Sequence, residues 1–180
     1  SQSYHYLQLS YPNFYVFLNG PYESFSKFAV LLTIGLLCMM FFYILYHKWT
    51  IQGASVVTLA MEVTLVCLFF LPAMHERYGY LLDVLSVVYF AFHKKHLYFP
   101  IAFNFISLIS YVKYLLQLET FNQSFLALAN LICLILLTAD LFSELRESNA
   151  DPKDPFHQTT AQKNSIPKLS KKLAVSRIKR

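Results

Sequence analysis

Long runs of apolar residues alternate with short polar breaks along most of this chain. A transmembrane helix needs about 20 mostly apolar residues, and five runs approach or reach that length. The pattern therefore predicts an all-α fold, a polytopic transmembrane helical bundle of about five spanning helices. The expected helices cover Phe28–Tyr46, Ala54–Ala73, Gly79–Phe92, Leu97–Leu116 and Ser124–Phe142.

The breaks divide the chain into three regions. An aromatic segment covers 1–26, a helical region covers 27–143 with a connecting loop at 74–78, and a polar tail covers 144–180. The chain begins with Ser, and its first residues lack the basic start, apolar core and cleavage site of a signal peptide. We therefore expect it to be the C-terminal part of a longer membrane protein.

Basic residues gather at alternate ends of the expected helices. The breaks "HKWTIQG" and "HKKH" and the tail hold most of them, whereas only Lys27, Arg77 and Lys113 lie at the other ends. Lys and Arg accumulate on the cytoplasmic side of membrane proteins. The segment 1–26 and the loop 74–78 are therefore expected to be extracytoplasmic, and the C-terminus cytoplasmic.

Composition agrees with a membrane protein. The chain is 56% hydrophobic and only 14% charged, whereas soluble domains carry roughly 25% charged residues. The cysteines at 38, 67 and 133 lie singly in apolar runs and are interpreted as small hydrophobic residues. The tail 144–180 has the profile of a disordered segment. It is either a solvated terminus or an arm for anionic lipid headgroups. No nucleic-acid partner is expected.

The break between the second and third runs carries the densest polar chemistry. It reads "LPAMHERYGYLLD", with His75, Glu76, Arg77 and Tyr78 in succession and Asp83 on the helix that follows. Histidine titrates near neutrality, and the planar guanidinium of arginine suits phosphate oxygens. These five residues are predicted to bind an anionic lipid headgroup. The stretch lacks the second histidine of an HExxH zinc site, so no metal ligands are assigned.

A structural interpretation of the same charges is also open. If the third helix starts by Glu76, then Glu76, Tyr80 and Asp83 share one face, with Asp83 about 10 Å deeper. Arg77 would then pair with Glu76 or Asp83 and lock two helix ends together. Tyrosines at this level are also enriched at membrane interfaces for lipid reasons alone.

Two stretches resemble the GT-C superfamily of membrane glycosyltransferases. "PAMHERYGYLL" is similar to the MHERY motif of bacterial members related to the GPI mannosyltransferases and the dolichyl-phosphate-mannose-dependent transferases. "LQLSYPNFYVFLNG", residues 7–20, is similar to a stretch that precedes the late helices of such proteins. The resemblance covers residues 7–93, and the later helices match only in type.

The resemblance implies an enzyme that moves a sugar from a polyprenyl-phosphate donor to an acceptor on the extracytoplasmic side. Its catalytic acid is expected in an earlier outer loop, so no catalytic residue is assigned. His75, Glu76, Arg77 and Tyr78 carry over as donor-binding positions. The expected partners are a polyprenyl-phosphate-linked sugar and membrane lipids. No cofactor is implied, and a divalent metal stays open. A bacterial plasma membrane is favoured, with the endoplasmic reticulum as the alternative.

Two other functions are compatible with the sequence. A transporter or flippase component would explain Glu62, Asp83 and Asp140 within apolar runs, since intramembrane ionisable residues often mark ion or substrate paths. A non-catalytic assembly subunit would use the same charges to pair helices. His93 and His96 have i, i+3 spacing, but the lysines between them disfavour a cation there.

Overall fold

The structure, a computed structural model, describes residues 11–18, 22–116 and 122–150. The described residues form five α-helices and two short 3-10 helices, with no strand among them. The chain divides into two compact units, 1–146 and 147–180, and the packing below is that of the first. The elements are η1 (Phe14–Phe17), α1 (Tyr22–Tyr46), α2 (Ala54–Phe70), η2 (Glu76–Tyr78), α3 (Gly79–Phe92), α4 (Tyr98–Leu116) and α5 (Gln123–Ala150).

The hydrophobic pattern predicted most helix ends well. The expected helix Gly79–Phe92 is α3 at both ends, and α4 starts one residue later than expected, at Tyr98. α2 stops at Phe70, short of the expected end at Ala73, because Leu71 is extended with φ −77° and ψ 142°. Leu71 precedes Pro72, whose ring disfavours the helical conformation in the residue before it.

The helical part of the chain extends beyond the expected region 27–143 at both ends. α1 begins at Tyr22, inside the segment 1–26. α5 continues through Ala150, so the prediction of a disordered tail is wrong for Glu144–Ala150. This stretch reads "ELRESNA", and Glu, Leu, Arg and Ala are good helix formers. The remainder of the predicted tail, 151–180, lies outside the described residues.

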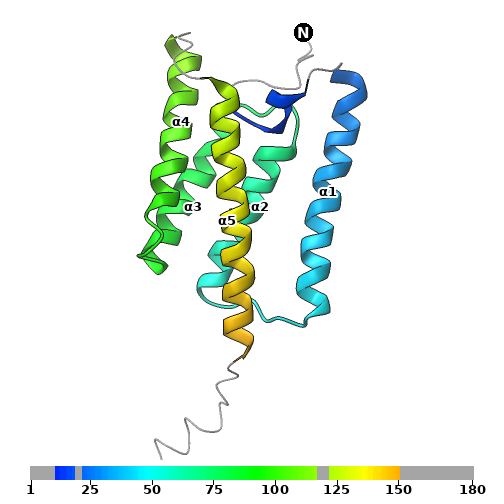
Figure 1. The fold of residues 1–180 in the computed structure, drawn as a ribbon, viewed down its shortest axis with the longest axis vertical. Helices are drawn as coiled ribbons and strands as arrows, with labels where there is room; N and C mark the ends of the chain where they lie inside the picture. Colours follow the sequence, from blue (N-terminus) through cyan, green and yellow to red (C-terminus); the bar gives the residue numbers. More distant parts are fainter. Residues whose placement is uncertain (1–10, 19–21, 117–121, 151–180) are drawn as a thin grey trace, which may run out of the picture. The chain divides into compact units, whose positions relative to one another are not determined.

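The first four helices pack in sequence order, α1 on α2, α2 on α3 and α3 on α4. Consecutive helices run in opposite directions (Figure 1), as short connections require. α5 crosses in front of α2 and α3 and is held there by side chains. The Thr138 hydroxyl lies 2.6 Å from Glu62 of α2, and Asp140 accepts a hydrogen bond of 3.1 Å from Tyr89 of α3.

The core lies where α2, α3, α4 and α5 meet, with the ring of Tyr11 added at one end. Its side chains are almost all aliphatic or aromatic. Of the three cysteines, which are free thiols, Cys133 is buried in this core, Cys67 is half-buried and Cys38 is exposed. Removing a large core side chain of this kind typically costs about 3–5 kcal/mol. Among the most buried core residues are Met61, Leu65, Phe69, Leu82, Tyr89, Phe99, Phe103 and Leu137.

Apolar side chains also cover much of the outer surface. Leu31, Phe42 and Leu45 of α1 are 69%, 69% and 73% exposed. The stretches Phe25–Tyr46 and Gln123–Asn149 are long and apolar enough to cross a membrane, and α2 is apolar but shorter. Only 22% of the first stretch is buried, whereas the core helix of a soluble protein buries its apolar face. Length and composition thus support two of the five expected spans.

Candidate functional site

The HERY turn, residues 75–78, joins α2 to α3 through a strained connection. Ala73 has a φ of 55°, a left-handed conformation that costs a non-glycine residue roughly 1–2 kcal/mol. His75 is extended, and Glu76–Tyr78 then form one 3-10 turn. The Tyr78 N–H donates to the His75 carbonyl at 3.1 Å. The chain therefore reverses direction within a few residues, and successive side chains of the turn point different ways.

The four side chains of the HERY turn differ sharply in exposure. Arg77 and Tyr78 are exposed, whereas Glu76 is only 2% exposed. The His75 side chain is 20% exposed, and its Nδ1 lies 3.9 Å from Glu76 Oε2. That carboxylate oxygen has no hydrogen-bond partner among the described residues. The turn thus presents a guanidinium and a phenol outward, with an imidazole backed by a buried carboxyl group.

Two structural expectations about this turn are wrong. Glu76 does not share a face with Tyr80, since Glu76 is 2% and Tyr80 66% exposed, whereas Tyr80 and Asp83 are three residues apart on α3. The cause is the 3-10 turn, which has 3.0 residues per turn and rotates Glu76 inward. Arg77 also forms no ion pair within 4.0 Å with Glu76 or Asp83; the ion pairs in the described part of the chain involve only histidines. The guanidinium is therefore available to a ligand.

The YPN loop, residues 11–13, packs directly against the connection that leads into the HERY turn. The Tyr11 N–H donates to the Met74 carbonyl at 3.3 Å, and the Tyr15 hydroxyl donates to the Phe70 carbonyl at 2.7 Å. The Phe70 carbonyl is one that α2 leaves free at its last residue, whereas Met74 lies in the connection after the helix. Burial raises the pKa of Tyr11 above its usual value, so its hydroxyl stays protonated. The two stretches that resemble the glycosyltransferases therefore lie in contact.

Two buried asparagines hold the YPN loop in place. Asn13 accepts from the Tyr15 N–H at 3.1 Å and donates to the Leu71 carbonyl at 3.5 Å. Asn130 of α5 donates to the Pro12 carbonyl at 2.9 Å. Both asparagines are fully buried, and buried polar groups are nearly always hydrogen-bonded. Asn13 lies in the stretch at residues 7–20 that resembles the glycosyltransferases, but sequence reasoning did not single out Asn130, because a hydrophobic pattern gives no sign of a contact across 118 positions.

Gly79, the first residue of α3, packs closely against Tyr11 of the YPN loop. A Cβ atom there would lie 3.0 Å from Tyr11 Cε2 and 3.1 Å from Ser107 Oγ. The Tyr11 ring is 1% exposed and has little room to move. We expect Gly79→Ala to lower the free energy of unfolding by about 1–2 kcal/mol, as overpacking does. SDS-induced unfolding in bicelles measures the change.

Gly35 of α1 is the matched control, because nothing lies within 4 Å of the position that a Cβ atom would take there. Gly35→Ala should leave stability unchanged or raise it by about 0.5–1 kcal/mol, since alanine loses less backbone entropy in a helix. Equal effects of the two substitutions would show that the contact between Gly79 and Tyr11 is not tight in solution.

Asp83 lies apart from the exposed face of the turn. Its Oδ1 accepts a hydrogen bond of 2.8 Å from Ser107 of α4, and its backbone carbonyl accepts one of 2.7 Å from Ser86. The carboxylate therefore links α3 to α4 through Ser107, and not through Arg77 as the structural interpretation of these charges expects. Its assignment to the donor site stays a prediction.

A second polar group, here called the histidine–carboxylate cluster, consists of Tyr89, His93, His96, Asp140 and Glu144. His96 Nδ1 lies 2.9 Å from Asp140 Oδ2, and both atoms contact the Tyr89 hydroxyl, at 2.8 and 3.1 Å. His93 Nε2 lies 3.6 Å from Glu144 Oε1, and its ring stacks on Tyr89. The cluster ties the connection between α3 and α4 to α5.

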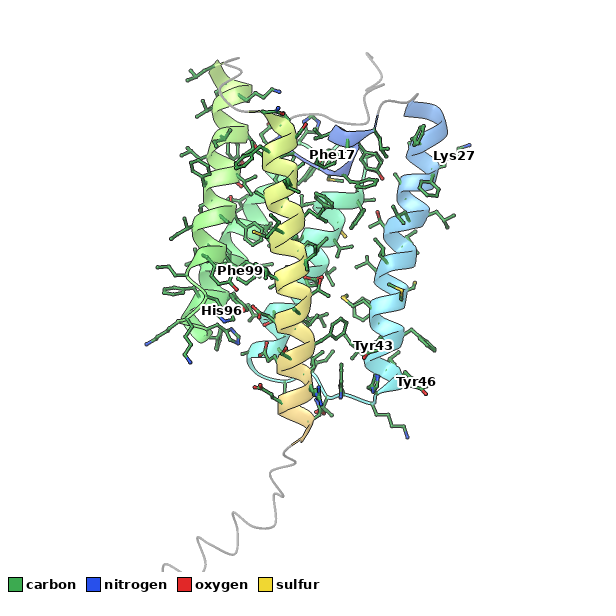
Figure 2. All side chains as sticks on the ribbon, in the orientation of Figure 1. Phe17, Lys27, Tyr43, Tyr46, His96 and Phe99 are labelled. Carbon is green, nitrogen blue, oxygen red and sulfur yellow. The ribbon has the colours of Figure 1, made fainter. Side chains whose placement is uncertain are left out.

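This cluster lies at the end of the helices opposite the HERY turn. Figure 2 shows His96 and Tyr46 at one end, and Phe17 and Lys27 at the other. Sequence reasoning considered His93 and His96 only as a pair with i, i+3 spacing and missed their partners on α5. The i, i+4 spacing of Asp140 and Glu144 on one helix face was the available signal. Within the described ranges, no three His, Cys, Asp or Glu side chains are placed to hold a metal ion.

Comparison with known proteins gives no match. No protein-family model fits the chain, and no curated protein or solved structure matches it significantly. The family resemblance therefore rests on the two quoted stretches alone, and function is inferred from the chemistry of the residues that the fold brings together.

Proposed function

We propose that this chain is the C-terminal part of an integral membrane glycosyltransferase. In this proposal the HERY turn binds the phosphate and sugar of a polyprenyl-phosphate donor, and transfer takes place on the extracytoplasmic side. The observation that carries it is the exposed guanidinium of Arg77, unpaired in the described part of the chain, beside an imidazole with a buried carboxyl group behind it. That combination suits an anionic ligand presented at the end of apolar helices.

The chemistry of the proposed reaction fits these groups. When a sugar leaves a polyprenyl phosphate, negative charge develops on the phosphate oxygens. Fixed positive groups that meet this charge in the transition state are among the largest contributors to catalysis. Arg77 offers a planar two-pronged donor, and His75 can donate a proton or a hydrogen bond. The buried carboxyl group of Glu76 lies 3.9 Å from His75 Nδ1, close enough for an electrostatic contact but too far for a hydrogen bond.

The proposed setting is a membrane that all five helices cross. α1 and α5 are long and apolar enough to do so, and because these two helices run in the same direction (Figure 1), the chain between them must return across the membrane through α2, α3 and α4. The exposed leucines and phenylalanines of these helices would face lipid. Soluble monomers rarely expose large contiguous apolar patches. The HERY turn and the YPN loop would then lie at the extracytoplasmic rim, where a lipid carrier presents its head group while its tail stays among the helices.

A transfer assay tests the proposal. Full-length protein in liposomes is given a radiolabelled polyprenyl-phosphate sugar and the membrane fraction of the source cells, and consumption of the donor is followed. We expect His75→Ala to slow consumption about tenfold, equivalent to one hydrogen bond to a charged group. Lys27→Ala, which removes a cation near the same helix ends, should have no effect.

Two outcomes would refute the proposal. If His75→Ala consumed the donor at the wild-type rate, the HERY turn would not be the donor-binding site. Failure of the wild-type protein to consume any polyprenyl-phosphate sugar would refute the transferase function itself.

A transporter or flippase component is the second candidate, favoured by Glu62 within α2. Glu62 is 2% exposed and one of its carboxyl oxygens lacks a hydrogen-bond partner among the described residues. Buried ionisable groups of this kind often line ion or substrate paths. Substrate flux that depends on a proton gradient would favour the transporter, because sugar transfer from a phosphate-linked donor needs no gradient.

A further inference from the structure

The connection between α3 and α4 is a tight turn with two lysines at its centre. This stretch, His93–His96, is here called the HKKH turn. It is closed by a hydrogen bond of 2.9 Å from the His96 N–H to the His93 carbonyl. A bond from residue i+3 back to residue i is typical of a β-turn. Lys94 and Lys95 are the two central residues of this turn, and both are exposed.

The two histidines fasten the HKKH turn to α5 and engage the carboxylates nearest to it. His96 Nδ1 lies 2.9 Å from Asp140 Oδ2. His93 Nε2 lies 3.6 Å from Glu144 Oε1. Neither lysine of the turn forms an ion pair within 4.0 Å in the described part of the chain. The fold therefore holds the turn through its histidines and leaves two adjacent ammonium groups exposed.

Apolar side chains flank the two lysines in the chain. Phe92, the last residue of α3, is 58% exposed, and Leu97 and Tyr98, where α4 begins, are 48% and 42% exposed. Apolar surface of this kind is stabilised when it leaves water, and tyrosine is enriched at the level of lipid headgroups. Lysines beside exposed apolar side chains thus fit the boundary between headgroups and acyl chains, where the charged end of a lysine stays in water.

The HKKH turn lies at the end of the helices that is expected to be cytoplasmic. Figure 2 shows His96 and Tyr46 at this end, opposite Phe17 and Lys27. In the proposed membrane setting, the turn meets the cytoplasmic leaflet, whose anionic lipids attract basic residues. The lysines, the flanking apolar side chains and the level in the membrane agree on one kind of ligand.

We propose that the HKKH turn binds the phosphate of an anionic phospholipid through Lys94 and Lys95, with the flanking apolar side chains beside its acyl chains. A zwitterionic phospholipid carries a cation of its own, which the two lysines repel. A soluble phosphate would leave the apolar side chains in water. The inference rests on the membrane setting proposed above and is independent of sugar transfer.

Photolabelling in nanodiscs tests the inference. Full-length protein is placed in nanodiscs of phosphatidylcholine with a minor share of phosphatidylglycerol, and one of the two lipids carries a diazirine near the headgroup end of an acyl chain. Mass spectrometry of the peptides measures the label on residues 92–98. After correction for lipid share, we expect phosphatidylglycerol to label this segment about 25-fold more than phosphatidylcholine, which is about fivefold for each lysine.

Charge substitutions locate the effect. Lys94→Gln combined with Lys95→Gln should lower the preference about 25-fold, whereas arginine at both positions should keep it. Lys48→Gln is the matched control, because Lys48 is exposed at the same end of the helices but lies between α1 and α2. It should leave the labelling of residues 92–98 unchanged. Thermal unfolding confirms that each variant is folded.

A water-soluble headgroup separates a lipid site from a phosphate site. Glycerophosphoglycerol has the phosphate of phosphatidylglycerol but no acyl chains. We expect it not to displace the lipid label from residues 92–98. Displacement would show that the lysines bind phosphate without lipid and would overturn the inference.

Three further outcomes would overturn it. The first is equal labelling of residues 92–98 by the two lipids in the wild type, as when an acidic protein segment occupies the turn instead. The second is a preference that survives replacement of both lysines by glutamine. The third is an equal loss per lysine in Lys48→Gln, which would indicate a general attraction of the basic membrane face. Absence of label from α1 and α5 as well would contradict the membrane setting itself.

Discussion

Replacing Arg77 by Ala is expected to slow donor consumption by about 100-fold to 1,000-fold, the usual loss when one donor to a developing oxyanion is removed. The guanidinium is exposed and makes no ion pair within the described part of the chain, so its removal leaves no buried charge behind. The fold should therefore be unaffected. The loss should appear in kcat as well as in kcat/KM, because the charge on the phosphate grows in the transition state.

Arg77→Lys separates charge from geometry. Lysine keeps the positive charge but lacks the planar fork that grips two phosphate oxygens at once. We expect a loss of about tenfold, intermediate between the wild type and Arg77→Ala. If Arg77→Ala consumes donor within threefold of the wild-type rate, the guanidinium does not contact the leaving phosphate.

Replacing Asn130 by Leu is expected to lower the free energy of unfolding by about 2–3 kcal/mol. Asn130 is fully buried and donates to the Pro12 carbonyl at 2.9 Å. Leucine would leave that buried carbonyl without a donor. The YPN loop should also loosen from Met74, so the KM for the donor should rise even at temperatures where the protein stays folded.

Asn104 provides the control for this substitution. Its side chain also donates to a proline carbonyl, that of Pro100, at 2.8 Å, but the residue is exposed on α4. Leucine there should change stability by less than about 0.5 kcal/mol. SDS-induced unfolding in bicelles compares the two variants. Equal losses at both positions would mean that Asn130 does not anchor the loop.

Polar chemistry is concentrated at both ends of the helices, with the HERY turn at one end and the histidine–carboxylate cluster at the other. The HERY turn leaves a cation exposed, whereas the cluster engages its histidines with carboxylates from α5. We interpret the first as a ligand site and the second chiefly as a connection between helices. The two ends differ because α5 places carboxylates beside the histidines of the cluster, whereas no acidic side chain in the described part of the chain forms an ion pair with Arg77.

The sequence by itself determined the helices. Apolar runs of sufficient length predicted all five, and α3 matched at both ends because its flanking breaks are sharply polar. The apolar run at Ala54–Ala73 overestimated α2, which stops at Phe70 because Pro72 disfavours the helical conformation in the residue before it. The polar turn between α2 and α3 was equally visible, since His75, Glu76 and Arg77 are adjacent in the chain.

Only the tertiary structure decided how the polar residues are used. A pattern of apolar and polar positions cannot show that Glu76 is buried while its neighbour Arg77 is exposed. The directions of both side chains depend on the 3-10 turn at Glu76–Tyr78. Nor can it show that Asn130 reaches the YPN loop across 118 positions of the chain. Such contacts depend on which helix faces pack together. That choice is made by side-chain packing over the whole bundle, where distant residues become neighbours, and local sequence does not encode it.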